Sequence, residues 1–369
     1  MRHIFSLALC FVCLHAATTR AAATHAGAAP VDASGLTPLE RQREVTLRNK
    51  LCSNKQLSCD YVDTIFADPR LTLYPPPEPA PPPSPAAKKT RERNPYLTER
   101  FGLLTPESLE RCRSFIAAHS MAFNAASVLY GVPREVICGH LRLETDFGLP
   151  TRLTPHPLGT IPAVSRLVSL YVRQPAHQRR GSTFAHRQDF AFNQLGLLFS
   201  AASANGWDLF SVPGSPTGAI GLAQFEPSAF SVAVDGDGDH KIDLFDPEDA
   251  ILSIAHYLVT RGWDANPEHE KRAVYAYYGG HYDSDPNKFY MKAVLTYADQ
   301  VRSYLQQHPV ESALTLPVAP PSAQADITVL PAVPLPPDAS ALPPGANPPT
   351  DVFTSPANAA AAQQGQTGR

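Results

Sequence analysis

The chain has 369 residues, of which 38 are proline, roughly twice the usual share. Proline is excluded from helix interiors and central strands, because it lacks an N–H donor and its ring clashes with the preceding turn. We therefore expect the prolines to gather outside the core. With 43% hydrophobic and 18% charged residues, the chain can build a core, which excludes disorder throughout. The formal net charge of −3 gives no electrostatic basis for binding nucleic acid.

The first residues have the pattern of a secretory signal peptide. Arg2 and His3 form a short basic start, residues 4–14 are an apolar run, and residues 21–23 are alanines suited to cleavage. We predict a signal peptide over residues 1–23 and export to the periplasm. The apolar run is too short to span a bilayer as a helix, which takes about 20 residues. No later segment reaches about 18 uninterrupted apolar residues, so we predict no transmembrane helix in the mature chain.

The six cysteines fall into two groups. Two lie inside the apolar run behind bulky residues, so we do not expect a lipid anchor. The other four stay in the exported chain: Cys52, Cys59, Cys112 and Cys138. Cys52 and Cys59 are close enough in sequence to close a small loop in an oxidising compartment. Because four cysteines allow three pairings, the pairing stays open, and buried free thiols at Cys112 and Cys138 are an equal alternative.

Apolar residues recur at three- to four-residue steps through the middle of the chain, which predicts helices. Alternating strand patterns are scarce. We therefore predict a mainly α fold whose helices pack around one core. The expected helical segments are residues 40–66, 108–130, 134–144, 164–172, 184–205, 247–260, 268–278 and 286–306.

The prolines are concentrated in two stretches. Residues 75–85 hold eight prolines and predict a polyproline II segment. Residues 310–369 hold twelve more, among Ala, Ser and Gln, and predict a disordered tail. Such segments can act as spacers or as docking peptides for a partner.

A first candidate for chemistry is residues 141–148, which read L-R-L-E-T-D-F-G. Glu144 lies at the end of a short, largely apolar helix. Burial raises the pKa of a carboxyl group, which lets it stay protonated near neutral pH and act as a general acid. Taken alone, Glu144 is better explained as a solvent-facing residue at a helix end. Asp146 should face elsewhere, as a turn or cap residue.

A second candidate is residues 214–228, which read G-S-P-T-G-A-I-G-L-A-Q-F-E-P-S. Gly218 and Gly221 allow close approach of backbone, and Gln224 adds an amide that both donates and accepts. Such a loop suits the hydroxyl and acetamido groups of a sugar. A tight contact between helices through small residues is the alternative.

In this order, E-T-x-F-G followed by G-A-x-G-x-x-Q-F resembles the family of membrane-bound lytic murein transglycosylase B. The resemblance covers about residues 36–306, including G-V-P at residues 131–133 and Gly-Trp at residues 262–263. It implies a mainly α, lysozyme-like fold with one catalytic domain over residues 36–307. The proline-rich run, residues 75–90, would then be a surface loop inside that domain.

The resemblance also implies roles, residue by residue. Glu144 matches the catalytic acid and base. The positions that match substrate-binding residues are Phe147, Arg179, Arg180, Ser215, Gln224 and Tyr277. The arginine pair would meet the acidic peptide stem of the substrate, since guanidinium groups pair with carboxylates. The chain departs from the family at Tyr278, which stands where the family has Asn.

Residues 235–243, D-G-D-G-D-H-K-I-D, resemble a calcium-binding loop of the EF-hand type. A histidine replaces the usual glycine at position 6, and an aspartate replaces glutamate at position 12. The transglycosylase family has a longer variant of the loop, so the implied ligands are Asp235, Asp237, Asp239, the Lys241 carbonyl and Asp249. The ion would be structural, Ca²⁺ or Na⁺, and no organic cofactor is implied. An acidic solvated turn is the alternative.

The resemblance implies cleavage of the MurNAc–GlcNAc β-1,4 bond of peptidoglycan. Glu144 would protonate the glycosidic oxygen and then act as base toward the C6 hydroxyl, which gives a 1,6-anhydromuramyl end without water. One carboxyl group then serves both steps, whereas ordinary glycosidases use two. Two alternatives remain: a lysozyme-like muramidase, which hydrolyses the bond, and a non-catalytic protein that binds or assembles the wall.

Overall fold

The structure is a computed structural model that describes residues 35–75, 93–151, 154–173, 182–264, 266–280 and 282–310. The predicted signal peptide, the proline-rich run after Pro75 and the tail after residue 310 lie outside the described residues. No helix within these ranges is both long enough and apolar enough to cross a membrane.

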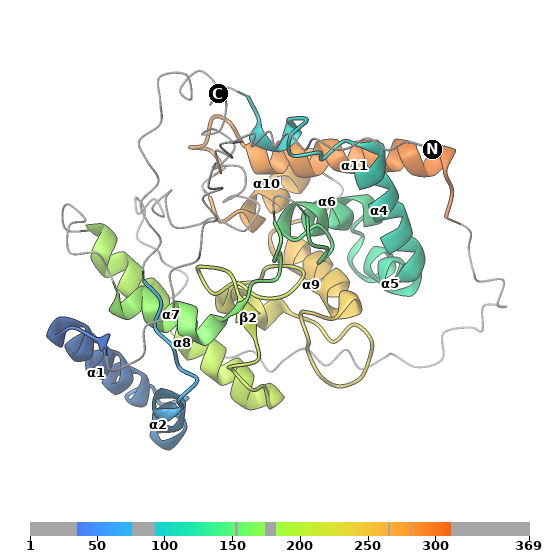
Figure 1. Cartoon of the computed structure of the whole chain (residues 1–369). Coiled ribbons are helices and arrows are strands. Elements are labelled where there is room, and N and C mark those ends of the chain that lie inside the picture. The colour runs from blue at the N-terminus through green and yellow to red at the C-terminus, as the bar shows by residue number, and fades with distance from the viewer. Residues whose placement is uncertain are drawn as a thin grey trace, which may run out of the picture.

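The described residues are mainly helical, as predicted (Figure 1). Two strands of two residues, β1 (Ile161–Pro162) and β2 (Pro213–Gly214), pair antiparallel. Short 3-10 turns are η2 (Pro95–Leu97) and η3 (Pro227–Val232). The α-helices are α1 (Pro38–Cys52), α2 (Cys59–Ala67), α4 (Pro106–Ala118), α5 (Ser120–Tyr130), α6 (Arg134–Glu144), α7 (Ala163–Val172), α8 (Ser182–Asn205), α9 (Pro247–Thr260), α10 (Pro267–Tyr277) and α11 (Phe289–Gln307).

Several prolines outside the two proline-rich stretches start helices. Helices α1, α4, α9 and α10 each begin at a proline that follows a capping residue: Thr37, Thr105, Asp246 and Asn266. Each cap side chain accepts a hydrogen bond from a backbone N–H of the first turn. Proline is tolerated there because the N–H that it lacks has no partner within the helix. These prolines therefore fix helix starts without disturbing the core.

The N-terminal helices form a group with α7 and α8, seen at the lower left of Figure 1. A disulfide between Cys52 and Cys59 joins the end of α1 to the start of α2. Residues 53–58 divide the predicted helical segment 40–66 into two helices. Cys112 and Cys138 are buried free thiols, so the structure has the Cys52–Cys59 loop together with the free-thiol alternative and not two disulfides.

The prediction of one helix over residues 108–130 is wrong, because the chain bends at His119. That residue ends α4 and precedes α5 with φ −117° and ψ 34°. Helix α4 packs on α11, and α5 packs on α9. The bend changes which residues face the core: Met121 and Val128, which continue the apolar periodicity, are 73% and 83% exposed.

Helix α6 lies at the centre of the molecule, in contact with α4, α5, α9 and α11 (Figure 1). Every residue from Val136 to Glu144 is buried. At Gly139 the helix comes so close to α11 that an added Cβ atom would lie 2.9 Å from Val294 Cγ1. Glycine is therefore required at this crossing, and Tyr290, one turn before Val294, is brought against the end of α6.

Candidate active site

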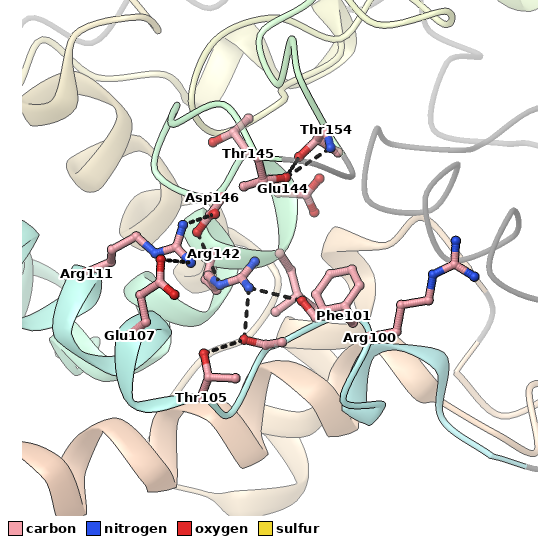
Figure 2. A pocket seen from close by; sticks show the side chains of 13 residues that line it. Arg100, Phe101, Thr105, Glu107, Arg111, Arg142, Glu144, Thr145, Asp146 and Thr154 are labelled. Atoms are coloured by element: carbon pink, nitrogen blue, oxygen red, sulfur yellow. Dashed lines mark hydrogen bonds and ion pairs between the residues drawn. The ribbon is translucent and has the colours of Figure 1, made fainter. Parts of the chain in front are cut away.

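Glu144 is the last residue of α6 and is only 6% exposed. It lines a pocket of about 310 Å³ together with residues from the segments 100–111 and 142–154 (Figure 2). Two and three positions after it, Asp146 and Phe147 both have left-handed backbone conformations, with φ 51° and 59°. Such conformations are uncommon for residues other than glycine. The Thr145 hydroxyl donates to the Leu222 carbonyl at 3.0 Å. The end of α6 is therefore fixed in a tight turn against the glycine-containing loop.

The neutral side chains of Tyr290 and His140 form a hydrogen-bonded chain that ends on the Glu144 carboxyl group. The Tyr290 hydroxyl donates to Glu144 Oε1 at 2.6 Å, and it lies 2.8 Å from His140 Nδ1. Burial and the nearby Glu144 carboxylate raise the pKa of Tyr290 well above its ordinary value, so the hydroxyl keeps its proton. Burial lowers the pKa of His140 to about 3, so its ring is uncharged at neutral pH. The carboxyl group thus has a hydrogen-bond donor that brings no positive charge.

The loop predicted to bind sugar packs against this turn. Ser215 is 2% exposed, and its Oγ accepts from the backbone N–H groups of Thr217 and Ala219 at 3.3 and 3.1 Å. Gln224 has a left-handed backbone with φ 49°, and its Nε2 donates to the Gly221 carbonyl at 2.9 Å. Its Oε1 is buried without a hydrogen-bond partner in the described structure. Ser215 therefore organises the loop, while Gln224 keeps an unused acceptor.

Three further residues named in the sequence analysis also lie close to the end of α6. The Tyr277 hydroxyl donates to the Ala223 carbonyl at 2.6 Å, and its ring lies 4.3 Å from that of His140. Tyr278 is 38% exposed and stacks on Tyr290 with ring centroids 5.5 Å apart. Phe147 is 5% exposed and packs on Phe115, so in this structure its ring belongs to the core.

The other side of the pocket has paired charges (Figure 2). Asp146 Oδ2 lies 2.6 Å from Arg111, and its Oδ1 lies 3.2 Å from Arg142. Arg142 is 6% exposed and also donates to the Ser108 hydroxyl at 2.7 Å. Glu107 pairs with Arg111 at 3.7 Å. Asp146 is thus a buried counter-ion, which extends the simple turn role predicted for it.

The predicted cation loop brings three carboxylates together. Asp235, Asp237 and Asp239 offer oxygens that all lie within 4.8 Å of one another, and clustered oxygens are the donors that hard cations prefer. Asp249 is 1% exposed and accepts from the Gly236 and Asp243 N–H groups, both at 2.6 Å. Burial raises its pKa to about 7, although these donors lower it. The three aspartates fit a cation, and Asp249 closes the loop onto α9.

Comparison with known proteins agrees with this arrangement. A model of the transglycosylase SLT domain matches residues 41–324. The chain belongs to the transglycosylase SLT domain family. It is 31% identical over 169 residues to the membrane-bound lytic murein transglycosylase B of Escherichia coli K12. That match covers 46% of this chain and 42% of the relative, so the chain spans less than half the length of this curated relative.

Solved structures confirm the predicted lysozyme-like transglycosylase fold for this SLT-domain chain. The E. coli lytic transglycosylase Slt35, solved in complex with calcium, has a TM-score of 0.52 at 19% identity, over 71% of this chain and 93% of that one. Soluble lytic transglycosylase SltB1 of Pseudomonas aeruginosa has a TM-score of 0.53 at 20% identity, over 72% and 99%. At these identities the likeness is one of fold.

The structure adds two residues to the site of this SLT-domain chain that the sequence did not suggest. Tyr290 lies 146 positions after Glu144, and no local pattern links the two. His140 is four positions before Glu144 on α6, and that i, i+4 spacing is a signal that could have identified it. Of the predicted substrate-binding residues, Arg179 and Arg180 lie outside the described residues.

Proposed function

We propose that this chain is a lytic transglycosylase that cleaves the MurNAc–GlcNAc β-1,4 bond of peptidoglycan. The observation that supports it is the difference among the carboxyl groups that line the pocket. Asp146 and Glu107 are engaged in ion pairs with Arg111 beside the pocket, whereas the Tyr290 hydroxyl orients Glu144 at the end of α6. Glu144 is therefore the group to which we assign both proton transfers.

In the proposed reaction, protonated Glu144 gives its proton to the glycosidic oxygen while the bond from C1 to that oxygen breaks. The acetamido group of the substrate meets the positive charge at C1. The C6 hydroxyl of the same MurNAc then attacks C1, and its proton returns to Glu144. The product is a 1,6-anhydro end. A structure with this fold, SltB3 of P. aeruginosa, was solved in complex with NAG-anhNAM-pentapeptide, a ligand with such an end.

The proposed substrate contacts follow the predicted residues. We propose that the Oε1 atom of Gln224, which has no hydrogen-bond partner in the described structure, accepts from a sugar hydroxyl or acetamido N–H. Tyr277 and Ser215 support the walls through the Ala223 carbonyl and the loop backbone. Arg179 and Arg180 are proposed for the peptide stem, and Phe147 for the packing beneath the sugar.

The proposed location is the periplasm, with the proline-rich segments as docking sites for cell-wall machinery. The disulfide between Cys52 and Cys59 supports export, because such bonds persist in oxidising compartments. A structural Ca²⁺ or Na⁺ ion is proposed at the loop, held by Asp235, Asp237, Asp239 and the Lys241 carbonyl, with Asp249 as the closing residue. The clustered carboxylate oxygens support it.

The test is digestion of purified sacculi by the wild type and by Glu144→Gln. We expect the wild type to release anhydromuropeptides and Glu144→Gln to release them about a thousandfold more slowly, since general acid–base catalysis contributes that order of rate. The matched control is Glu107→Gln, which removes an exposed carboxyl group from the same pocket and should leave the rate unchanged. Mass spectrometry of the products identifies the ends.

Three outcomes would overturn the proposal. Equal release by the wild type and Glu144→Gln would remove Glu144 from its role. Products heavier by one water would identify the muramidase. Binding to sacculi without any release would identify a non-catalytic wall protein.

A further inference from the structure

His140 has no role in the reaction proposed above, yet the site is built around it. Its ring is fully buried one helical turn before Glu144 and lies against Tyr277 and Tyr290, with ring centroids 4.3 and 5.8 Å away. A polar ring in such a place costs free energy unless its nitrogens are hydrogen-bonded. One nitrogen, Nδ1, is bonded to the Tyr290 hydroxyl, and the other, Nε2, has no partner in the described structure.

The direction of the hydrogen bonds follows from the number of protons. A tyrosine hydroxyl has one proton to donate. When Glu144 is ionised, that proton points at Oε1, so the Tyr290 oxygen can only accept from His140. His140 must then have its proton on Nδ1. The ring is uncharged, because burial lowers the pKa of His140 to about 3, and so it does not relay protons itself.

We propose that His140 is a positioning residue that, through its Nδ1–H, fixes the Tyr290 hydroxyl as a donor to Oε1 of Glu144. This inference rests on the proposed function of Glu144 and adds to it. Without the Nδ1–H, the Tyr290 hydroxyl is free to rotate, and the carboxyl group loses its fixed orientation. Orientation of the acid contributes to the rate and little to the binding of substrate.

Two substitutions separate this role from simple packing. His140→Leu fills the space with an apolar side chain and removes the donor. His140→Asn leaves a gap, but its amide nitrogen can occupy the place of Nδ1 and donate to Tyr290. We expect His140→Leu to lower kcat about tenfold, the usual value of one hydrogen bond, with KM changed less than twofold. His140→Asn should keep kcat within about threefold of the wild type.

Thermal melting should rank the two variants in the opposite order. His140→Leu, which fills a buried site with apolar atoms, should melt at least as high as His140→Asn, which leaves a cavity. Activity that follows stability, with His140→Leu the more active variant, would show that His140 only packs and would overturn the proposal. His140→Gln is a second variant, in which the amide is displaced toward the place of Nε2. It should lose activity as His140→Leu does, and wild-type kcat in His140→Gln would also overturn the proposal.

The effect should depend on Tyr290. In a Tyr290→Phe background, His140→Leu should cause no further loss of kcat. A second tenfold loss there would show that His140 acts by another route and would overturn the proposal. Failure of the proposed function is distinguishable, because it appears as unchanged activity in Glu144→Gln. An inactive Glu144→Gln, together with indistinguishable His140→Leu and His140→Asn, overturns only the role of His140.

Discussion

The two sides of the α6 terminus hold two buried carboxyl groups in opposite ways. Glu144 is 6% exposed and accepts from the uncharged Tyr290, while Asp146 is 3% exposed and lies between Arg111 and Arg142. Burial raises the pKa of Asp146, and the positive charges of the two arginines lower it. The two groups are two positions apart, so sequence proximity does not decide their roles.

The comparison shows how a chain can keep one carboxyl group reactive beside another that is structural. The Tyr290 hydroxyl orients the Glu144 carboxyl group through one hydrogen bond. The Asp146 carboxylate instead balances the positive charges of Arg111 and Arg142. Arg142 is itself buried and therefore needs this counter-charge. Two carboxyl groups of similar burial therefore differ in the partners that position them.

The largest expected effect is a loss of stability when the ion pairs of Asp146 are removed. Asp146→Asn leaves Arg142, which is 6% exposed, without its buried counter-charge. We expect the free energy of unfolding to fall by about 3–5 kcal/mol, as measured by urea denaturation. Glu144→Gln is the matched control, because its amide keeps the shape of the carboxyl group and should change stability by less than about 1 kcal/mol. Equal losses in both variants would contradict the distinction drawn here.

The cation loop sharpens the comparison, because its carboxylates accept from backbone N–H groups of their own loop. Asp235, Asp237 and Asp239 face one another. Ca²⁺ at a hundred times its dissociation constant should raise the free energy of unfolding by about 2.7 kcal/mol. Melting curves in Ca²⁺ and in EDTA measure this. Asp237→Asn should reduce the response, whereas Asp243→Asn, the same charge change outside the cluster, should keep most of it. A melting point independent of Ca²⁺ would argue for an acidic turn.

The helices of the site could be predicted because their signals are local. The bounds 134–144 agree with α6, since Pro133 fixes the start and Gly148 follows the end. The bend at His119 could not be predicted, because the apolar periodicity runs through it and only the packing of α4 on α11 and of α5 on α9 requires it.

The candidate site shows the same limit. Glu144 and Gln224 lie in motifs that the sequence displays, so their proximity could be inferred from a resemblance. The bond from Tyr290 to Glu144 depends on the close crossing of α6 and α11 at Gly139. Such a crossing is a property of the three-dimensional packing. The sequence of α6 contains no signal that predicts its contact with α11, and the sequence of α11 contains none for α6. Chain-specific partners of a known motif are therefore found only when the fold is assembled.

The smallest expected effect concerns Glu226, a partly buried carboxyl group within the glycine-containing loop of residues 214–228. Burial raises its pKa from 4.5 to about 7. Between these pH values the folded chain binds more protons than the unfolded chain, so stability falls as pH rises from about 4.5 to 7 and stays lower above it. Glu226→Gln lacks this titration. It should therefore exceed the wild type by about 1–3 kcal/mol at pH 8 and match it at pH 4.

Urea denaturation at both pH values measures this difference, and Glu99→Gln, at an exposed position, is the control for loss of one negative charge. If Glu99→Gln gives the same gain at pH 8, the effect comes from net charge and not from burial of Glu226. If Glu226→Gln gives no gain at pH 8, burial alone does not make a carboxyl group costly in this fold.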